Sequence, residues 1–202
     1  GWSPSIHLFS QSGGKPKWDA AQLCFIPGAS VQSERSTGSA RGTFALSDCI
    51  REGFSAGAEA AQASGHKAEI PNTPETSATE PLAVEALWEI PSGRKGTRAF
   101  VDFQNDVTTG DLRLAAREGY QSVEHVKRYT TAGMGIDQGK TGNINVIGIL
   151  AQNYELEPPE VGTTTFRPPY SPISFGVMAG IDQGQLIIPS RRTPMTDWHE
   201  KE

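Results

Sequence analysis

Residues 133–141 are the segment with the clearest potential for chemistry, because three glycines precede Lys140 and Thr141 there. A phosphate-binding P-loop follows a strand and places a glycine five positions before its Gly-Lys-Thr. Here that position is Met134, and the preceding residues have a helical pattern, which argues against a nucleotide-hydrolysing site. We expect Lys140, Thr141 and the amides after them to hold a phosphate or a flavin edge at a helix start. The alternative is an ordinary helix cap.

A second glycine-containing loop, residues 37–44, leads into a helix that the apolar spacing predicts over residues 45–63. Glycines in this loop allow a ligand to approach the backbone closely, and the helix start favours an anion. The alternative is a plain turn before a surface helix. The candidate binding residues of this loop are Gly38, Gly42, Thr43 and Phe44.

Arg167 precedes two prolines, which fix an extended backbone and give a long cation a defined direction. Such a cation can face an anionic ligand or a partner protein. The four histidines are scattered, and Cys24 and Cys49 form neither a CxxC motif nor a zinc-type cluster. We find no paired carboxylates and no Ser-His-Asp set, so the sequence predicts no catalytic residue in this chain.

Composition excludes several classes of protein. The 202 residues carry a net charge of −5, so a cationic surface for nucleic acid is not expected. The apolar run at residues 144–151 is far shorter than the roughly 20 residues of a membrane helix. Two cysteines without a disulfide framework are typical of a reducing compartment, so we expect a cytoplasmic protein.

The apolar pattern also predicts the elements that position these loops. An extended entry is expected at residues 6–9 and a second apolar patch at 23–26. A strand at 99–103 precedes three helices, over 107–118 with Thr108 or Thr109 as cap, over 123–131 with Ser122 as cap, and over about 139–154. Residues 162–170 are expected to lie extended against another part of the chain, before a short helix at 173–179.

Three runs together resemble the alpha subunits of heterotetrameric sarcosine oxidases: residues 121–131, 135–143 and 162–170. The resemblance covers nearly the whole chain. It implies an α+β fold in which residues 1–65 are the C-terminal part of a Rossmann-type NAD-binding domain of the disulfide-reductase kind. Residues 66–97 would be a linker, 98–190 the small helical domain of these subunits, and 191–202 the entry to a folate-binding, aminomethyltransferase-like domain.

The resemblance also implies a function. In this family sarcosine is oxidatively demethylated to glycine, and the methylene group passes to tetrahydrofolate or leaves as formaldehyde. FAD belongs to the beta subunit, FMN lies between alpha and beta, and gamma and delta subunits complete the complex. The loop at 37–44 would contribute to the NAD site through Gly38, Gly42, Thr43 and Phe44. The FMN site would be lined by Lys140, Thr141 and Arg167.

The alternative function is that of a non-catalytic structural or interaction subunit of a related amine, opine or glycine dehydrogenase complex. The helical domain also resembles the 2Fe-2S module of bacterioferritin-associated ferredoxin type, in which four cysteines hold the cluster. The matching positions here are Asp102, Gln104, Asp137 and Gly142. Iron–sulfur ligation requires cysteine thiolates, so no cluster is expected, and the loops would be retained for contact with FMN or the beta subunit.

Overall fold

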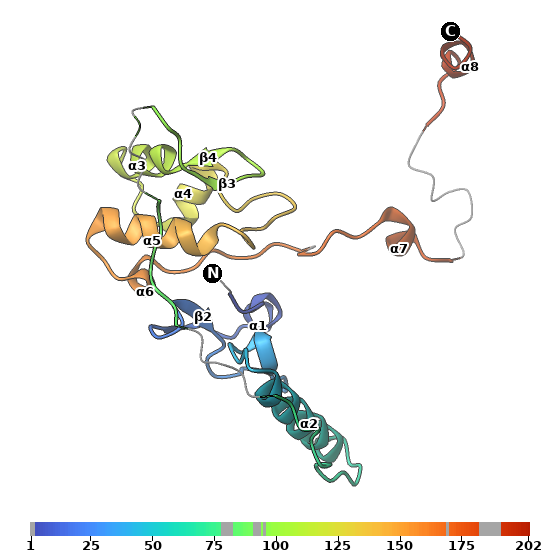
Figure 1. Cartoon of the computed structure of the whole chain (residues 1–202). Helices are drawn as coiled ribbons and strands as arrows, with labels where there is room; N and C mark the ends of the chain where they lie inside the picture. Colours follow the sequence, from blue (N-terminus) through green and yellow to red (C-terminus); the bar gives the residue numbers. More distant parts are fainter. Residues whose placement is uncertain (1–2, 78–82, 91–93, 95, 169, 182–190) are drawn as a thin grey trace. The chain divides into compact units, whose positions relative to one another are not determined.

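The computed structural model describes residues 3–77, 83–90, 94, 96–168, 170–181 and 191–202. The chain divides into two units, Gly1–Phe166 and Arg167–Glu202, and each is considered by itself (Figure 1). Short helices alternate with two antiparallel two-stranded sheets in the first unit. The expected α+β composition is thereby confirmed.

The first unit opens with helix α1 (His7–Gln11) and the hairpin of strands β1 (Lys17–Asp19) and β2 (Cys24–Ile26). The expectation of an extended entry at residues 6–9 is wrong, since these residues lead into α1. Phe9 is only 3% exposed. Its ring lies where a Cβ on Gly14 would come within 2.3 Å of Cζ, so the chain turns back tightly over this ring. A tertiary contact therefore overrides the short apolar pattern.

The predicted helix over 45–63 is confirmed as α2 (Leu46–Ala63), which follows the 3-10 turn η1 (Gly38–Ala40). Ala58 is the one buried residue along α2. The chain leaves the helix through Gly65, whose φ of +83° favours glycine. In the described residues between 66 and 97 there is neither helix nor strand.

A helical region follows, and most of the core belongs to it. Its elements are β3 (Phe100–Asp102), β4 (Val107–Thr108), α3 (Thr109–Arg117), α4 (Val123–Thr130), α5 (Asn143–Tyr154) and α6 (Pro158–Val161). Helix α3 packs against both α4 and α5, and α5 against α6. Leu112, Val126 and Leu150, one from each of the three longer helices, are fully buried at the centre. The predicted strand and three helices are confirmed.

Three boundaries differ from the sequence-based expectation. Val107 and Thr108 pair with β3 before the helix begins, and Thr108 caps α3 in a reciprocal capping box with Asp111. Helix α5 begins at Asn143 instead of about 139, because positive φ angles at Gln138 and Gly139 interrupt the helical backbone. Helix α6 was not expected, although a proline is well suited to the first turn of a helix.

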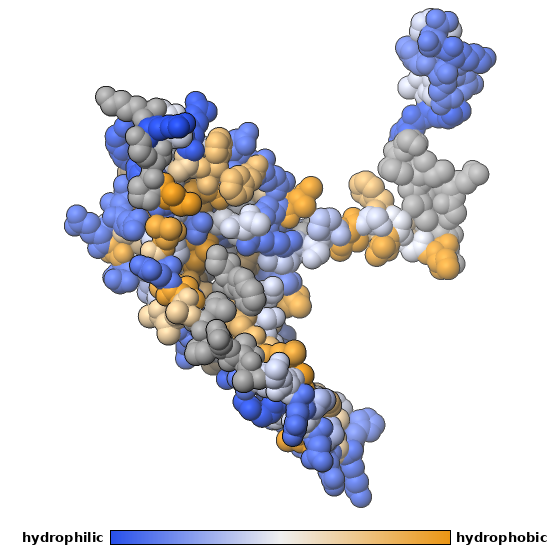
Figure 2. All heavy atoms as spheres, viewed as in Figure 1, coloured by the Kyte–Doolittle hydropathy of each residue, from blue (hydrophilic) through white to orange (hydrophobic). Residues whose placement is uncertain are grey.

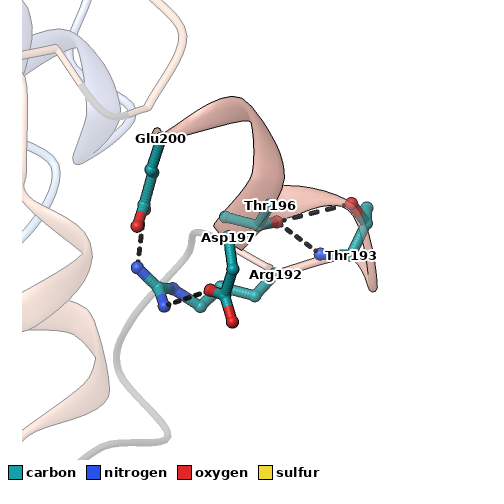
Figure 3. Close-up of polar contacts among 5 residues, drawn as sticks. All are labelled: Arg192, Thr193, Thr196, Asp197 and Glu200. Atoms are coloured by element: carbon teal, nitrogen blue, oxygen red, sulfur yellow. Dashed lines mark hydrogen bonds and ion pairs between the residues drawn. The ribbon is translucent and has the colours of Figure 1, made fainter. Parts of the chain in front are cut away.

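The second unit contains α7 (Phe175–Ala179), which lies within the predicted helix at 173–179, and α8 (Thr196–His199), which was not predicted. Apolar side chains are exposed over α7 (Figure 2), among them Phe175 and Val177. Ahead of α8, Arg192 forms ion pairs with Asp197 at 3.2 Å and Glu200 at 2.6 Å (Figure 3). Across the described residues, no helix combines the length and apolar character that a membrane crossing needs.

Candidate functional site

The loop at 37–44, which was predicted to face a cofactor, is held together by a carboxylate from α2. Glu52 accepts hydrogen bonds from the Gly38 amide at 2.9 Å and from the Thr43 hydroxyl at 2.8 Å. Burial alone would raise the pKa of Glu52, but these bonds, with nearby arginines, hold that pKa below its ordinary value. The Gly38 amide and the Thr43 hydroxyl therefore already have an anionic partner within the chain.

Gly42 occupies a position that requires glycine. It is buried, and its φ is +95°. A Cβ here would lie 2.8 Å from Cγ2 of Ile26 and 3.3 Å from Oε1 of Gln22. That Oε1 atom is itself buried and has no hydrogen-bond partner within the described part of the chain. Gly42 thus brings the backbone against an amide group with an unused acceptor.

A hollow of about 760 Å³ opens beside this loop, a volume within the range of small-molecule sites. Six stretches of the first unit surround it: Ser3, the turn between β1 and β2 at 22–23, the loop at 42–44, the first turn of α2, residues 83–88 and the first turn of α5. The lining residues are Ser3, Gln22, Leu23, Gly42, Thr43, Phe44, Ala45, Asp48, Ala83, Val84, Glu85, Leu87, Trp88, Ile144 and Asn145. Gly42, Thr43 and Phe44 were predicted as site residues, whereas Gly38, Lys140 and Thr141 do not line the hollow.

The linker wall of the hollow is attached to the helical core. Trp88 lies over Gly148 of α5, where a Cβ would come within 2.2 Å of the indole ring. The next residue, Glu89, accepts a hydrogen bond from the Thr109 hydroxyl at 2.8 Å and forms an ion pair with Arg113. The Arg113 hydrogen bond is the main cause that holds the pKa of Glu89 below its ordinary value. The wall is therefore positioned by the contacts of Trp88 and of the residue that follows it.

A second feature joins the loop after β3 to residues 133–142. Asp102 is 3% exposed, and its carboxylate accepts hydrogen bonds from the amides of Gly133 at 2.7 Å and of Gln104 at 2.9 Å. Oε1 of Gln104 in turn accepts from the Asp137 amide at 2.7 Å. A Cβ on Gly142 would lie 2.2 Å from the carbonyl oxygen of the residue before Asp102. The structure thus brings Asp102, Gln104, Asp137 and Gly142 together.

Hydrogen bonds to main-chain atoms hold these two loops against each other. The described residues contain no group of three or more histidine, cysteine or acidic side chains placed to hold a metal ion. Carboxylate and amide side chains therefore join the two loops through main-chain hydrogen bonds.

Lys140 and Thr141 lie on the exposed side of the same loop. The Thr141 hydroxyl donates to the Asp137 carboxylate at 3.1 Å, and the Lys140 amide donates to the Asp137 carbonyl at 3.0 Å. Burial, and then the charge of Lys140, lower the pKa of His7 in α1. Arg167 belongs to the second unit. Its association with Lys140 and Thr141 around one ligand therefore stays a prediction.

Residues 162–166 lie extended across the helical region, as the sequence predicted. The side-chain amide of Asn143 donates to the Thr164 hydroxyl at 2.6 Å. The ammonium of the buried Lys127 donates to the Thr165 carbonyl at 2.8 Å. The carbonyl of Phe166 accepts from Gln11 of α1 at 2.8 Å. The segment just before Arg167 is thus anchored to α4, α5 and α1.

Sequence reasoning did not identify several residues that line the hollow. Gln22 and Asp48 carry no motif. Glu85 and Trp88 lie in a proline-rich linker, where the apolar stretch before residue 88 was the available signal, since a tryptophan there is most stable against a packing partner. Leu23 has φ of +50°, an unusual value for leucine that the sequence does not reveal.

Comparison with known proteins adds to this geometry. Residues 96–181 match the family described as the Sarcosine oxidase A3 domain. Two similar relatives are the sarcosine oxidase alpha subunit of Rhizobium meliloti, 43% identical over 100% of this chain, and that of Corynebacterium sp. strain P-1, 40% identical over 98%. The chain covers 20% and 21% of these relatives, about a fifth of their length.

Two further similarities are weaker. An opine oxidase subunit from Rhizobium meliloti is 33% identical over 76 residues, which are 38% of this chain and 17% of that relative. The crystal structure of L-proline dehydrogenase from P. horikoshii superposes with a TM-score of 0.60, covers 85% of this chain and 36% of its own, and is 19% identical, so it shows a shared fold. Over nearly its whole length the chain is similar to one segment of the sarcosine oxidase alpha subunits, and residues 96–181 match the Sarcosine oxidase A3 domain.

Proposed function

We propose that this chain is the part of a flavin-dependent sarcosine oxidase alpha subunit that contributes to an NAD site and to the FMN environment shared with a beta subunit. The whole enzyme would convert sarcosine to glycine, with the methylene group transferred to tetrahydrofolate or released as formaldehyde. FAD on the beta subunit would perform the oxidation, and gamma and delta subunits would complete the assembly. This segment would bind and position cofactors without a catalytic residue of its own.

The observation that carries this proposal is the similarity to three sarcosine oxidase alpha subunits at 38–43% identity over nearly all of the chain. All of them are oxidoreductase subunits by name. The hollow beside Gly42 supports a binding role, because it combines a volume of about 760 Å³ with polar and aromatic lining residues. We also propose that residues 1–65 complete a Rossmann-type domain and that 191–202 begin a folate domain.

The NAD part of the proposal rests on Gly42, Thr43 and Phe44. These residues line the hollow, and a buried acceptor, Oε1 of Gln22, faces Gly42 without a partner in the described residues. Gly38 would act indirectly, because its amide binds Glu52 and so shapes the loop. NAD supplies a nicotinamide ring and two ribose groups, which match a site with both aromatic and hydrogen-bonding walls.

A matched pair of glycine substitutions tests the NAD site in the complete alpha subunit. Gly42→Ala and Gly65→Ala both place a Cβ at a positive φ, +95° and +83°, but a Cβ at Gly65 meets open space. We expect purified Gly42→Ala protein to retain less NAD than Gly65→Ala protein of equal melting temperature. Equal NAD content in the two variants and the wild type would remove Gly42 from the site.

The FMN part rests on Lys140, Thr141 and Arg167. Cations and hydroxyl groups stabilise a phosphate or a reduced flavin anion. Anchoring of residues 164–166 to the helical region supplies a fixed starting point for Arg167. Flavin transfers electrons between the substrate-oxidising centre and oxygen when it is bound.

Arg167→Ala in the assembled complex tests this assignment by stopped-flow reduction of both flavins. We expect FMN occupancy, or the rate of electron transfer from FAD, to fall about tenfold, the effect of losing one charge-assisted hydrogen bond. Reduction of FAD by substrate should stay nearly unchanged, because that step belongs to the partner. If Arg167 only pairs with a beta-subunit carboxylate, assembly weakens while the flavins in surviving complexes behave normally. Wild-type assembly and kinetics together would exclude Arg167.

A second candidate function is a structural or interaction role in a related amine, opine or glycine dehydrogenase complex. The similarity to the opine oxidase subunit, 33% over 76 residues, favours it. The fold shared with L-proline dehydrogenase is compatible with both candidates. Steady-state assays of the complex with sarcosine, proline and opines distinguish them, since the first candidate requires sarcosine to be the preferred substrate.

A further inference from the structure

Three large apolar side chains are exposed on two adjoining loops of the first unit, residues 103–106 and 133–138. Phe103 is 76% exposed, Ile136 66% and Met134 38%, and these three residues form the loop patch. None of them lines the hollow beside Gly42. A single exposed apolar residue is ordinary, but a group of them rimmed by polar residues is typical of an interaction surface.

The hydrogen bonds between the two loops bring the patch residues together. Asp102 accepts from the Gly133 amide at 2.7 Å. Gln104 accepts from the Asp137 amide, also at 2.7 Å. The two acceptor residues flank Phe103 in the sequence, and the two donor residues flank the stretch that carries the rest of the patch. The three apolar side chains therefore lie on backbone segments that are joined at both ends.

The polar side chains of these loops are used in bonds to the main chain, whereas the apolar ones reach solvent. The side-chain amide of Asn105 donates to the Thr131 carbonyl at 3.2 Å, and that of Gln138 donates to the Gly135 carbonyl at 2.8 Å. Apolar area in contact with water is unfavourable. A surface that is already held in place loses little conformational freedom when a partner binds. The loop patch is thus suited to an apolar partner surface.

The charge around the patch indicates which kind of partner fits. The charged side chains of the two loops are the carboxylates of Asp106 and Asp137, and Lys140 lies three positions further on. Asp106 forms no ion pair with another described residue. The excess of negative charge attracts arginine and lysine side chains and disfavours an anionic lipid surface. Phenylalanine and methionine are enriched in protein–protein interfaces.

Both loops lie within residues 96–181, the stretch that matches the Sarcosine oxidase A3 domain. We infer that the loop patch binds another subunit of the same enzyme complex, through an apolar surface bordered by arginine or lysine side chains. This inference rests on the proposed function, because it requires the chain to work within an assembly of subunits. It adds which surface of the chain makes the contact.

A matched pair of isoleucine substitutions in the complete alpha subunit tests the patch. Ile136→Asp places a charge in its centre, and Ile70→Asp changes an isoleucine that is 58% exposed in the stretch after α2. Biolayer interferometry measures the Kd of each purified alpha subunit for the remaining subunits, purified together. We expect Ile136→Asp to raise the Kd about thirtyfold, the scale of a central interface residue, and Ile70→Asp to change it less than about twofold. Both variants should melt at the wild-type temperature as isolated alpha subunits, because both side chains are exposed.

Asp106→Asn tests the charge at the rim of the patch. We expect association with the remaining subunits to slow about two- to fivefold at low ionic strength and to equal that of the wild type at about 0.5 M salt, where the charge is screened. An association rate that does not change at low salt would overturn the basic border of the partner surface.

Hydroxyl-radical footprinting of the unmodified protein distinguishes a partner subunit from the rest of the alpha subunit. We expect Phe103 and Met134 to be oxidised readily in the isolated alpha subunit and to be protected in the assembled complex. Protection already in the isolated alpha subunit would show that its own chain covers the patch, which overturns the inference. Equal oxidation in the two forms overturns it as well.

The results for Ile136→Asp also separate this inference from the proposed function. Wild-type affinity of this variant in a complex that oxidises sarcosine overturns the inference and keeps the function. Weakened assembly of this variant, with a wild-type complex that does not oxidise sarcosine, keeps the patch and overturns the function. Failure of the wild-type alpha subunit to bind the remaining subunits overturns both. Equal weakening by Ile70→Asp and Ile136→Asp overturns the assignment of the contact to the loop patch.

Discussion

The carboxylate of Asp102 accepts a hydrogen bond from the backbone amide of Gly133, 2.7 Å away and 31 positions later in the sequence. The same carboxylate accepts from the amides of Gln104 and Asn105, both at 2.9 Å. One buried side chain therefore ties the loop after β3 to the loop before α5. Stability experiments on this carboxylate test whether it holds the two loops together.

Asp102→Asn removes the charge and turns an acceptor into a donor that faces amide donors. We expect the free energy of unfolding to fall by about 2–3 kcal/mol, the cost of leaving buried donors unsatisfied. Asp106→Asn is the matched control, because Asp106 is exposed, has φ of +53° and tolerates asparagine; its change should stay within about 0.5 kcal/mol. Urea denaturation of the full chain measures both. Equal changes in the free energy of unfolding for the two variants would show that the Asp102 hydrogen bonds add no more stability than an exposed carboxylate does.

The contribution of Asp102 should depend on pH. Burial would raise its pKa, but the hydrogen bonds from Gly133, Asn105 and Gln104 outweigh burial and hold the pKa below the ordinary value. The unfolded chain therefore takes up this proton at a higher pH than the folded chain, so the stabilisation is complete above about pH 5 and is lost as the pH falls through the folded pKa. The stability difference between wild type and Asp102→Asn should narrow from pH 6 to pH 3. A constant difference would contradict the lowered pKa.

The N-cap residues of α3 and α4 should differ in how much they stabilise the chain. Thr108 accepts from the Asp111 amide and forms a capping box, so Thr108→Ala should cost about 1 kcal/mol. Ser122 occupies the corresponding position of α4 without a side-chain cap bond, so Ser122→Ala should change stability by less than about 0.5 kcal/mol. Thermal unfolding of the two variants measures the difference, and a larger loss for Ser122→Ala would refute the assignment.

Two helical glycines should respond oppositely to alanine. A Cβ on Gly53 in α2 meets open space, so Gly53→Ala should stabilise the chain by about 0.5–1 kcal/mol. A Cβ on Gly148 would lie 2.2 Å from the Trp88 ring, so Gly148→Ala should displace the indole and destabilise the chain. Tryptophan emission should shift to longer wavelength in Gly148→Ala alone. Unchanged emission there would mean that Trp88 does not lie over α5.

Local patterns in the sequence were sufficient for several elements. The helix over 46–63 follows from apolar residues at helical spacing, and the start of α3 follows from the threonines at 108 and 109, of which the structure selects Thr108 as the cap. These features depend on neighbours within one or two turns, and the sequence order contains that information. The resemblance to sarcosine oxidase alpha subunits was also readable from contiguous runs.

The tertiary structure decided the features that join distant segments. Gly38 was expected to face a ligand, yet Glu52, 14 positions later, binds its amide. The hollow beside Gly42 combines six stretches of chain, and its wall at residues 83–88 is placed by contact of Trp88 with Gly148. The bond between Asp102 and Gly133 likewise requires the loops to meet. Which distant groups meet depends on how the helices pack and on which buried polar atoms then find partners, and the local spacing of residues does not encode that outcome.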